Sequence, residues 1–386
     1  MSAPAGALRA RLTSFADSAP RGTGLVVAAW SPAKAWEPTG PPDSSPPGER
    51  GDPGTVTVCR GFTDRSARTP VTARTAFEIG SVTKTFTALL LAEMAARGEV
   101  GLRDPLGTHL PATVLPRGPH GAKSPAPALP AGPYGTRITL EHLATHSAGL
   151  PRLPPGLIRS ALPRWFANPY AAYPPERLLP ALSRVRLRHP PGTRTRYSNF
   201  GYGLLGRALA EAAGQDYPSL LRARVLDPLG LADAATGPAP GQATGHWHGR
   251  PRRPWEVPAL PGAAALRCSA RDLLRYLRAL IRPEHAAPPG SPLRAALAEV
   301  LRPRPVAADA PAACLAWTRR VLPTHTVHFH TGGTSGFTTL VGFSTEPAVA
   351  LVALTNTAPS LRGTFVQSGY LLLRDLIRRP VRLAGP

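Results

Sequence analysis

The sequence has few cysteines and no long hydrophobic run. Its cysteines, Cys59, Cys268 and Cys314, lie far apart and form no CxxC pair, which excludes a disulfide framework and predicts three small apolar side chains. Apolar stretches such as 348–354 are far too short to cross a bilayer. Residues 1–22 contain no signal-peptide core. These absences predict a cytoplasmic protein without a membrane span, unless the true start lies elsewhere.

Acidic residues are also scarce. The chain has 23 Asp and Glu against 45 Lys and Arg, a formal net charge of +22, which raises the question of nucleic-acid binding. The basic residues are almost all arginines, they are scattered along the chain, and no aromatic-interleaved basic motif accompanies them. We interpret the charge as a solvated basic surface that reflects the codon usage of a GC-rich genome, and we predict no nucleic-acid partner.

The chain has 386 residues, and 42% apolar residues are enough for a sizeable core. Strands are predicted at 24–30, 55–61, 313–320, 327–331, 338–344 and 348–356. Helices are predicted at 7–16, 81–97, 139–145, 175–182, 203–213, 216–225, 269–281, 293–301 and 365–378. Among the segments rich in proline, glycine or alanine, 31–54 is predicted to be a mobile hairpin loop, 115–135 a disordered insertion and 283–292 a loop. No clear pattern covers 237–261.

The predicted strands lie at both ends of the chain and the predicted helices lie mainly between them. Because neither group of strands makes a full sheet alone, the economical arrangement is one antiparallel sheet built from both ends, flanked by the terminal helices, with an all-helical lobe inserted. The predicted fold class is therefore mixed α/β (α+β). The sheet lobe would comprise residues 1–80 and 262–386, and the helical lobe residues 81–261.

The first candidate motif is Ser81-Val82-Thr83-Lys84, preceded by Gly80. Positions i and i+3 of a helix share a face, so the Lys84 amine is expected beside the Ser81 hydroxyl, which needs a base to become a good nucleophile. Burial and nearby positive charge can lower the pKa of a lysine enough for that role. The helix N-terminus would supply N–H groups for an oxyanion. The spacing equally describes a surface helix, but lysine occurs only three times in this sequence.

The second candidate motif is Tyr197-Ser198-Asn199. A tyrosine close to two cations is expected to have a lowered pKa and to act as a base or proton shuttle. The amide of Asn199 both donates and accepts, which suits the orientation of Lys84 and of a substrate. A plain helix start explains the same three residues when they are considered alone.

The third candidate motif is His330-Thr331-Gly332-Gly333, after an alternating stretch that begins at Val327. The glycines allow the backbone to approach a ligand closely, and His330 offers a titratable donor. A strand that ends in a glycine turn is the structural alternative.

Other histidines are possible metal ligands. The H-x-H pairs at 246 and 248 and at 328 and 330 lack a third ligand at a convincing spacing. His142 and His146 are interpreted as structural hydrogen-bonding residues. No metal site and no cofactor are predicted.

The three motifs, in this order, resemble the serine β-lactamase and penicillin-binding-protein superfamily. The tyrosine in the second motif makes the likeness closest to the branch of class C β-lactamases, D-alanyl-D-alanine carboxypeptidases and related esterases. The likeness runs from about residue 20 to the C-terminus, interrupted by the proline-rich insertions. Flanking segments are also similar to that branch, at 77–81, 104–106, 138–151, 191–205, 227–231 and 332–337, with Asn356 after them.

The resemblance implies a β-lactamase/transpeptidase-like fold and an acyl-enzyme formed on Ser81. It implies that Lys84 and Tyr197 share the base and acid roles, and that the backbone N–H groups of Ser81 and Gly333 form the oxyanion hole. The residues expected to orient these groups or the substrate are Asn199, His330, Thr331 and Gly332.

Two departures from the family pattern bear on the substrate. The third motif often carries lysine, whereas His330 stands here, and a neutral histidine attracts a substrate carboxylate only weakly. Gly262-Ala263-Ala264-Ala265-Leu266 stands where the family has a Gly-Gly-Leu segment, so the pocket edge is expected to differ. The sequence therefore favours an esterase-like serine hydrolase acting on a small ester, amide or peptide over a D-alanyl-D-alanine carboxypeptidase or β-lactamase.

A hypothesis of another class is a non-catalytic descendant that binds a ligand or a partner through the same cleft. The joint presence of Ser81, Lys84, Tyr197 and Asn199 argues against it, since a site without catalysis has no chemical need for them. The sequence does not determine the oligomeric state.

Overall fold

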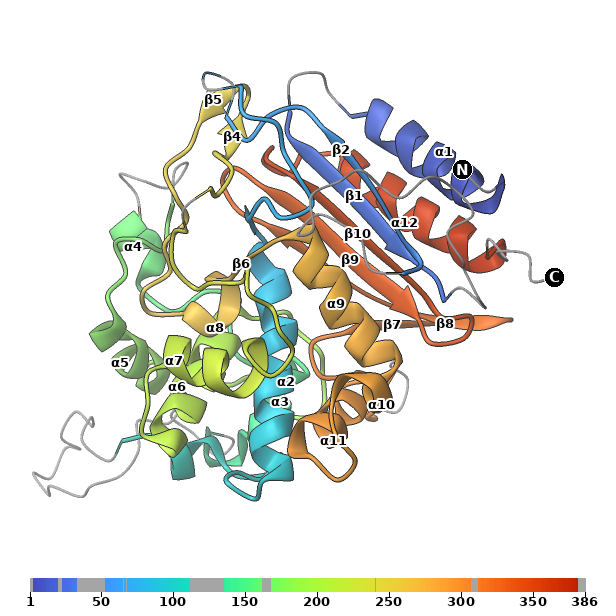
Figure 1. The fold of residues 1–386 in the computed structure, drawn as a ribbon. Helices are drawn as coiled ribbons and strands as arrows, with labels where there is room; N and C mark the ends of the chain where they lie inside the picture. Colours follow the sequence, from blue (N-terminus) through green and yellow to red (C-terminus); the bar gives the residue numbers. More distant parts are fainter. Residues whose placement is uncertain are drawn as a thin grey trace, which may run out of the picture.

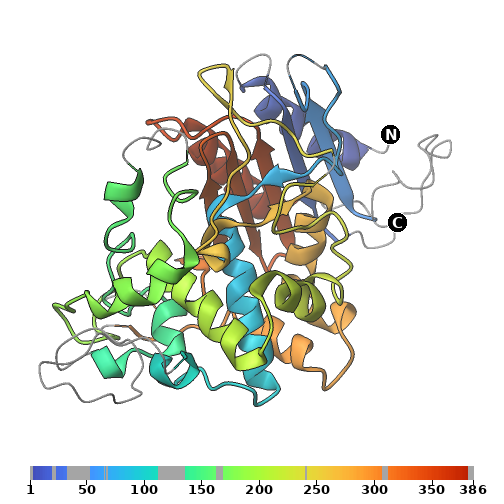
Figure 2. The ribbon, with the colours of Figure 1, turned by 90° about the vertical axis from the view of Figure 1, so that its left-hand side faces the viewer.

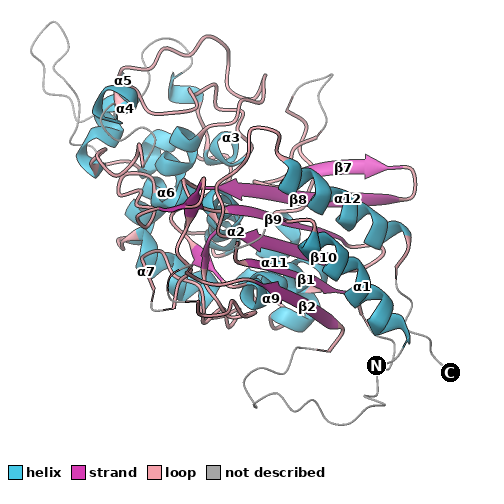
Figure 3. Cartoon of the chain, turned by 90° about the horizontal axis from the view of Figure 1, so that it is seen from above, coloured by secondary structure: helices cyan, strands magenta, loops and turns pink. Residues whose placement is uncertain are grey.

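The computed structural model describes residues 3–19, 23–32, 53–64, 66, 68–111, 135–161, 168–239, 241–306 and 312–380. Its main sheet has six antiparallel strands in the order β2-β1-β10-β9-β8-β7 (Figures 1 and 3). The strands are β1 (Leu25–Trp30), β2 (Thr55–Arg60), β7 (Thr318–Leu322), β8 (His325–Gly333), β9 (Thr338–Ser344) and β10 (Val349–Thr355). Because β1 pairs with β10, the predicted sheet built from both chain ends is confirmed.

Both faces of this sheet are covered, which explains why its central strands are apolar runs. In β1, Leu25, Val27 and Ala29 pack towards α1 (Ala3–Asp17) and α12 (Thr364–Arg378), while the residues between them pack into the larger core on the other face. Helix α9 (Ala270–Ile281) lies on that other face, against β1 and β10 (Figure 1). The predicted terminal helices and mixed α/β class are thus confirmed.

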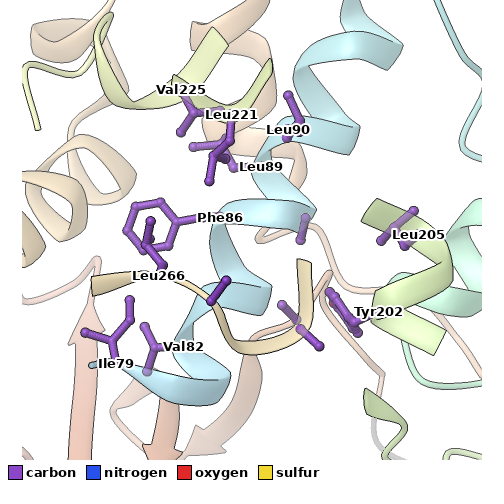
Figure 4. Packing of buried hydrophobic residues seen from close by; sticks show 14 of the residues in the cluster. Ile79, Val82, Phe86, Leu89, Leu90, Tyr202, Leu205, Leu221, Val225 and Leu266 are labelled. Carbon is purple, nitrogen blue, oxygen red and sulfur yellow. The ribbon is translucent and has the colours of Figure 1, made fainter. Parts of the chain in front are cut away.

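Helix α2 (Thr83–Ala96) runs through the centre of the molecule, between the sheet and the other helices (Figure 2). Every residue from Thr83 to Met94 is buried, as expected for a helix surrounded by protein on all sides. Figure 4 shows Phe86 and Leu89 facing Leu266 and Leu221 from the surrounding segments. The ring of Phe86 also stacks on Tyr276 of α9, with the centroids 4.2 Å apart.

The remaining helices and short strands connect these parts. The helices are α3 (Leu140–Ala144), α4 (Leu157–Ala161), α5 (Leu178–Ser183), α6 (Asn199–Ala213), α7 (Tyr217–Leu221), α8 (Pro261–Ala264), α10 (Pro283–Ala286) and α11 (Pro292–Glu299). The short strands are β3 (Phe77–Glu78), which pairs with β6 (Arg267–Cys268), and β4 (His246–Trp247), which pairs with β5 (Arg250–Pro251). No helix among the described residues has the length and apolar character needed to span a membrane.

Several predicted boundaries were wrong, for local reasons. Helix α6 begins four residues early, because the Ser198 hydroxyl accepts from the Gly201 N–H at 2.8 Å and caps it there. Strand β7 begins at Thr318 and not at 313, after Ala316 adopts a positive φ of 66°. The predicted loop 283–292 begins with the short helix α10, and the unpatterned 237–261 contains the β4–β5 hairpin.

Two predicted insertions lie largely outside the described residues, which omit 33–52 and 112–134. The proposed division into lobes at 80/81 and 261/262 stays a prediction.

Strand β8 ends directly against the turn that precedes α2. A side chain at Gly332 would overlap the carbonyl oxygen of Ile79, and a Cβ at Gly80 would lie 2.7 Å from the backbone nitrogen of Gly333. Gly80 also has a φ of 51°, which favours glycine. The two backbones therefore touch with no side chain between them, and this contact brings a strand edge next to residue 81.

Replacement of Gly332 by alanine is expected to lower the free energy of unfolding by about 1–3 kcal/mol, because the added methyl has no space. It should also push the turn at residue 81 away from β8. Urea unfolding measures the first effect. Gly237→Ala is the matched control, because no atom lies within 4 Å of a Cβ there. Equal stability of the two variants would contradict the close contact.

Candidate active site

Ser81 lies in the short 3₁₀ turn Gly80–Val82, and Lys84 lies in the first turn of α2. The spacing of three residues brings Lys84 Nζ to 3.2 Å from Ser81 Oγ. The Thr83 hydroxyl holds the turn in place, since it donates to the Gly80 carbonyl at 2.7 Å and accepts from the Leu266 N–H at 3.1 Å. The half-buried serine is therefore fixed beside the amine.

Lys84 is completely buried, with an exposed fraction of 0%. Its Nζ donates to the carbonyl of Ala263 in α8 at 2.7 Å and lies 5.0 Å and 5.6 Å from the ring centroids of Tyr197 and Tyr202. Burial, and secondly the positive charge of Arg152, hold the pKa of Lys84 well below its usual value. A neutral amine that accepts a proton from Ser81 is therefore accessible near neutral pH.

Tyr197 contacts the same serine, although it lies far from it in the sequence. Its hydroxyl donates to Ser81 Oγ at 2.6 Å. Burial raises the pKa of Tyr197 above its usual value, and the hydrogen bond to Ser81 and the charge of Arg152 only oppose this rise. The expected lowering of its pKa is therefore wrong, because removal from water outweighs the nearby cations. Tyr197 stays a protonated donor.

The backbone around Tyr197 is anchored to the segment 146–152. The Ser198 N–H donates to His146 Nδ1 at 3.1 Å, and the Ser198 hydroxyl donates to the Pro151 carbonyl at 2.7 Å. The Asn199 N–H donates to the carbonyl of Arg152 at 2.9 Å. These bonds fix the direction of the phenol.

Asn199 reaches the cavity but does not contact Lys84 by any hydrogen bond within the described part of the chain. Its Nδ2 donates instead to the Tyr170 hydroxyl at 2.7 Å. Asn199 Oδ1 is buried and has no partner among the described residues. A role of Asn199 in orienting Lys84 or a substrate stays a prediction.

Strand β8 brings His330, Thr331, Gly332 and Gly333 to the same place. His330 Nδ1 lies 2.8 Å from the Thr331 carbonyl, so the proton of the neutral ring belongs on Nδ1. Burial, and secondly the charge of Lys84, lower the pKa of His330 to about 3. This side chain, 7% exposed, is therefore neutral at physiological pH. The oxyanion hole formed by the N–H groups of Ser81 and Gly333 stays a prediction.

These groups open into a cavity of about 860 Å³. Its walls are rich in aromatic residues, and the described residues that line it include no carboxylate. Arg152 is the one permanently charged side chain among them. The aromatic residues of the wall are Tyr170, Tyr197, Trp247, Trp255 and Phe329.

A buried ion pair supports the wall from behind. Glu78 accepts from the Trp255 N–H at 2.6 Å and from the Thr334 hydroxyl at 2.7 Å, and it lies 3.9 Å from Arg267. Arg267 in turn donates to the Trp255 carbonyl. Trp255 and the residues after β8 are thus tied to β3, the strand that leads into the Ser81 turn.

Sequence reasoning missed four residues of this site. Arg152 and Tyr170 belong to no recognised motif, so the sequence did not indicate them as site residues. Trp255 lies in the segment without a clear pattern, so it was not indicated either. His146 was interpreted as a structural hydrogen-bonding residue, and its bond to Ser198 fits that role. It also lines the cavity, with its ring 4.5 Å from that of Tyr197 and a backbone φ of 59°. Such strain in a non-glycine residue is typical of functional sites.

The structure brings Ser81, Lys84 and Tyr197 together beside a Gly-Gly strand end, as the resemblance to the β-lactamase-related serine hydrolases predicts. Residues 21–374 match the model of the family named Beta-lactamase. The chain therefore belongs to the Beta-lactamase family, and the resemblance inferred from the three motifs is confirmed. The prediction of a β-lactamase-related serine hydrolase is confirmed at the level of this family.

Individual relatives agree with this assignment. A "Beta-lactamase" of Escherichia coli K12 is 28% identical over 231 residues, which cover 58% of this chain and 52% of the relative. The "D-alanyl-D-alanine-carboxypeptidase/endopeptidase AmpH" of the same strain is 36% identical over 165 residues, which cover 42% of this chain and 37% of the relative. The chain thus spans about half, or less, of the length of these curated relatives.

A solved structure supports the fold. The "Beta-Lactamase/D-Alanine Carboxypeptidase from Pseudomonas syringae" superposes with a TM-score of 0.74 over 98% of this chain and 100% of that one. At 21% sequence identity, this likeness concerns the fold alone.

Replacement of Lys84 by methionine is expected to abolish acylation and to raise the melting temperature at pH 7 by a few degrees. The unfolded lysine is protonated below its ordinary pKa of about 10.4, and folding must remove that proton or bury the charge. Because this penalty disappears as the pH rises towards the ordinary pKa, the stability advantage of Lys84→Met should shrink between pH 7 and pH 10.

The measurement is the melting temperature of the wild type and of Lys84→Met between pH 7 and pH 10. Ser81→Ala is the control, since it removes the nucleophile without removing the buried amine and should show no such pH-dependent gap. A gap that is absent, or that widens with pH, would contradict burial as the cause of the lowered pKa.

Proposed function

We propose that the protein is an esterase-like serine hydrolase that forms an acyl-enzyme on Ser81. The observation that carries the proposal is the double contact of Ser81 Oγ, with Lys84 Nζ at 3.2 Å and the Tyr197 hydroxyl at 2.6 Å, in the cavity wall. A nucleophile next to a base, with the base oriented by a third group, is the arrangement that acyl transfer needs. The Ala263 carbonyl orients Lys84 in this way.

The reaction would proceed in two halves. Ser81 Oγ attacks the substrate carbonyl while neutral Lys84 takes the hydroxyl proton, and the developing oxyanion is held by the N–H groups of Ser81 and Gly333. The Tyr197 phenol then protonates the leaving oxygen and recovers its proton from the Lys84 ammonium. In the second half, water attacks the acyl-enzyme, its proton returns to Ser81 Oγ through the same two groups, and the acid is released.

The size and polarity of the cavity support a small-molecule ester, amide or peptide as substrate. A cavity of about 860 Å³ with aromatic walls accommodates more than a short acyl group. Neutral His330 gives the sheet side no positive charge for a substrate carboxylate, which supports an esterase-like substrate.

A second candidate is D-alanyl-D-alanine carboxypeptidase or β-lactamase activity. What favours it is the naming of the relatives, whose matched regions cover about half of this chain. A panel of p-nitrophenyl esters, a chromogenic cephalosporin and D-alanyl peptides separates the two candidates, with Ser81→Ala run beside each substrate.

A fluorophosphonate probe should label the wild-type protein at Ser81. Peptide mapping by mass spectrometry locates the adduct, and Ser81→Ala should remain unlabelled. Ser147→Ala serves as a matched control, because that buried serine bonds Thr145 and is absent from the cavity lining. A properly folded wild-type protein that resists the probe would count against the proposed function and in favour of a non-catalytic binding protein.

His330→Lys is expected to raise kcat/KM severalfold for substrates that carry a carboxylate, because the longer lysine can extend its ammonium group from the buried strand into the cavity and keep a positive charge there. Neutral esters should gain nothing. Steady-state kinetics with one charged and one neutral ester of the same shape measure the effect. An equal change for both esters would show that the charge of residue 330 does not select substrates.

A further inference from the structure

Arg152 stands out among the residues that line the cavity. It follows the Gly149-Leu150-Pro151 turn on the helical side, whereas His330 comes from the sheet side. The carbon at the centre of its guanidinium group lies 5.2 Å from the centroid of the Tyr197 ring, and the hydroxyl of that ring bonds Ser81. One phenol ring thus separates this cation from the nucleophile.

The backbone at Arg152 is firmly held although the side chain is exposed. Its carbonyl accepts from the N–H groups of Asn199 and Phe200, at 2.9 Å and 3.3 Å, where α6 begins. The same segment holds Ser198 through Pro151. The arginine is therefore carried by the framework that positions Tyr197, so the fold fixes where its backbone lies relative to the reacting atoms, and its guanidinium group lies against the Tyr197 ring.

No carboxylate neutralises this charge among the described residues, and no hydrogen bond of its guanidinium group occurs there. Arginines with a structural role in this protein are paired differently. Arg267 lies 3.9 Å from Glu78, and Arg304 donates to Glu141 at 3.0 Å. An arginine that faces a cavity without an acidic partner is available for a ligand.

Among the described residues that line the cavity, Arg152 is the permanently charged side chain. His330 is neutral, and the Lys84 amine is buried with its own partners, Ser81 and Ala263. A planar guanidinium group matches a carboxylate with two parallel hydrogen bonds, which a point charge does not. The aromatic rings of Tyr170 and Trp255, 5.6 Å apart, offer an apolar wall for the rest of the ligand.

We propose that Arg152 is a specificity-determining residue that binds a carboxylate of the substrate from the helical side of the cavity, near Tyr197. The family pattern puts a cation in the third motif, on the strand; here the recognition charge lies on the segment after α3. The inference rests on the proposed function and deepens it, because it names acidic esters as the substrate class.

A further consequence concerns the pH profile. The charge of Arg152 contributes to the lowered pKa of Lys84, after burial. A bound carboxylate offsets that charge, so the pKa of Lys84 should be higher in the complex with an acidic ester than with a neutral one. The acid limb of the kcat profile should then lie at higher pH for the acidic ester than for the neutral one. The acid limb of the kcat/KM profile reports the free enzyme, so it should lie at the same pH for both esters.

The test uses two pairs of esters of equal shape. The first pair is mono-p-nitrophenyl adipate and p-nitrophenyl 6-oxoheptanoate, which differ by a carboxylate on the acyl side. The second pair is 4-acetoxybenzoate and 4-acetoxyacetophenone, which differ by a carboxylate on the leaving group. For each pair, the ratio of kcat/KM for the acidic ester to that for the neutral ester is the measured quantity.

Arg152→Gln is expected to lower this ratio at least tenfold in one pair or in both, and Arg152→Glu to lower it further. Arg196→Gln is the matched control, because this exposed arginine directly precedes Tyr197 but does not line the cavity, and it should leave the ratio unchanged. High salt should lower the wild-type ratio more than that of Arg152→Gln, because the wild type has the additional cation in the cavity.

The outcomes separate the two proposals. If Arg152→Gln hydrolyses the acidic and neutral esters with the same ratio as the wild type in both pairs, the assignment of Arg152 is overturned and the proposed function stands. If the wild type hydrolyses none of the four esters and resists the fluorophosphonate probe, the proposed function fails and the inference falls with it. A lower ratio for Arg196→Gln as well would show a general effect of surface charge and would overturn the assignment.

Discussion

The burial of one amine is the constraint on which the site depends. Lys84 is enclosed by protein, and an isolated ammonium in such a place is costly. The enclosure is tolerated because the amine bonds Ala263 and Ser81 and lies over two tyrosine rings, and because the lowered pKa makes its neutral form accessible. The same burial that would penalise a structural lysine makes this one a base beside a serine.

That burial explains the arrangement of the larger elements. A helix whose every face must be covered needs neighbours on all sides, and α2 obtains them from helices that follow it in the chain, among them α3, α6, α8 and α11. The end of β8 then closes the site, because its glycines let backbone meet backbone at the Ser81 turn. Residues 81 and 333, far apart in the sequence, are thus neighbours in the fold.

The parts of the site that follow from local geometry could be predicted from the sequence. The spacing of Ser81 and Lys84 is one helical turn, and the glycines after His330 mark a close backbone approach. The sheet built from both chain ends followed from the positions of the strand patterns. Contacts between distant segments could not be predicted, since nothing in the local pattern shows that Arg152 and Tyr170 face Tyr197 and Asn199.

Electrostatics was the least predictable part. The nearness of cations to Tyr197 suggested a lowered pKa, and two cations do lie near its ring. The depth of burial decides the sign, and depth is a property of the whole fold. The same holds for His330, whose neutral state follows from burial next to Lys84 and not from the residue type.

The distribution of charge across the cavity links these points. On the sheet side, His330 is neutral, and on the helical side Arg152 is always charged. A cation near Tyr197 has two effects, one on the pKa of Lys84 and one on an anionic ligand. It adds to the burial that lowers the pKa of the Lys84 amine, and under the proposal it attracts an anion to the wall from which the phenol donates. Because an incoming carboxylate would weaken the first effect as it satisfies the second, substrate charge and base strength are coupled through one arginine.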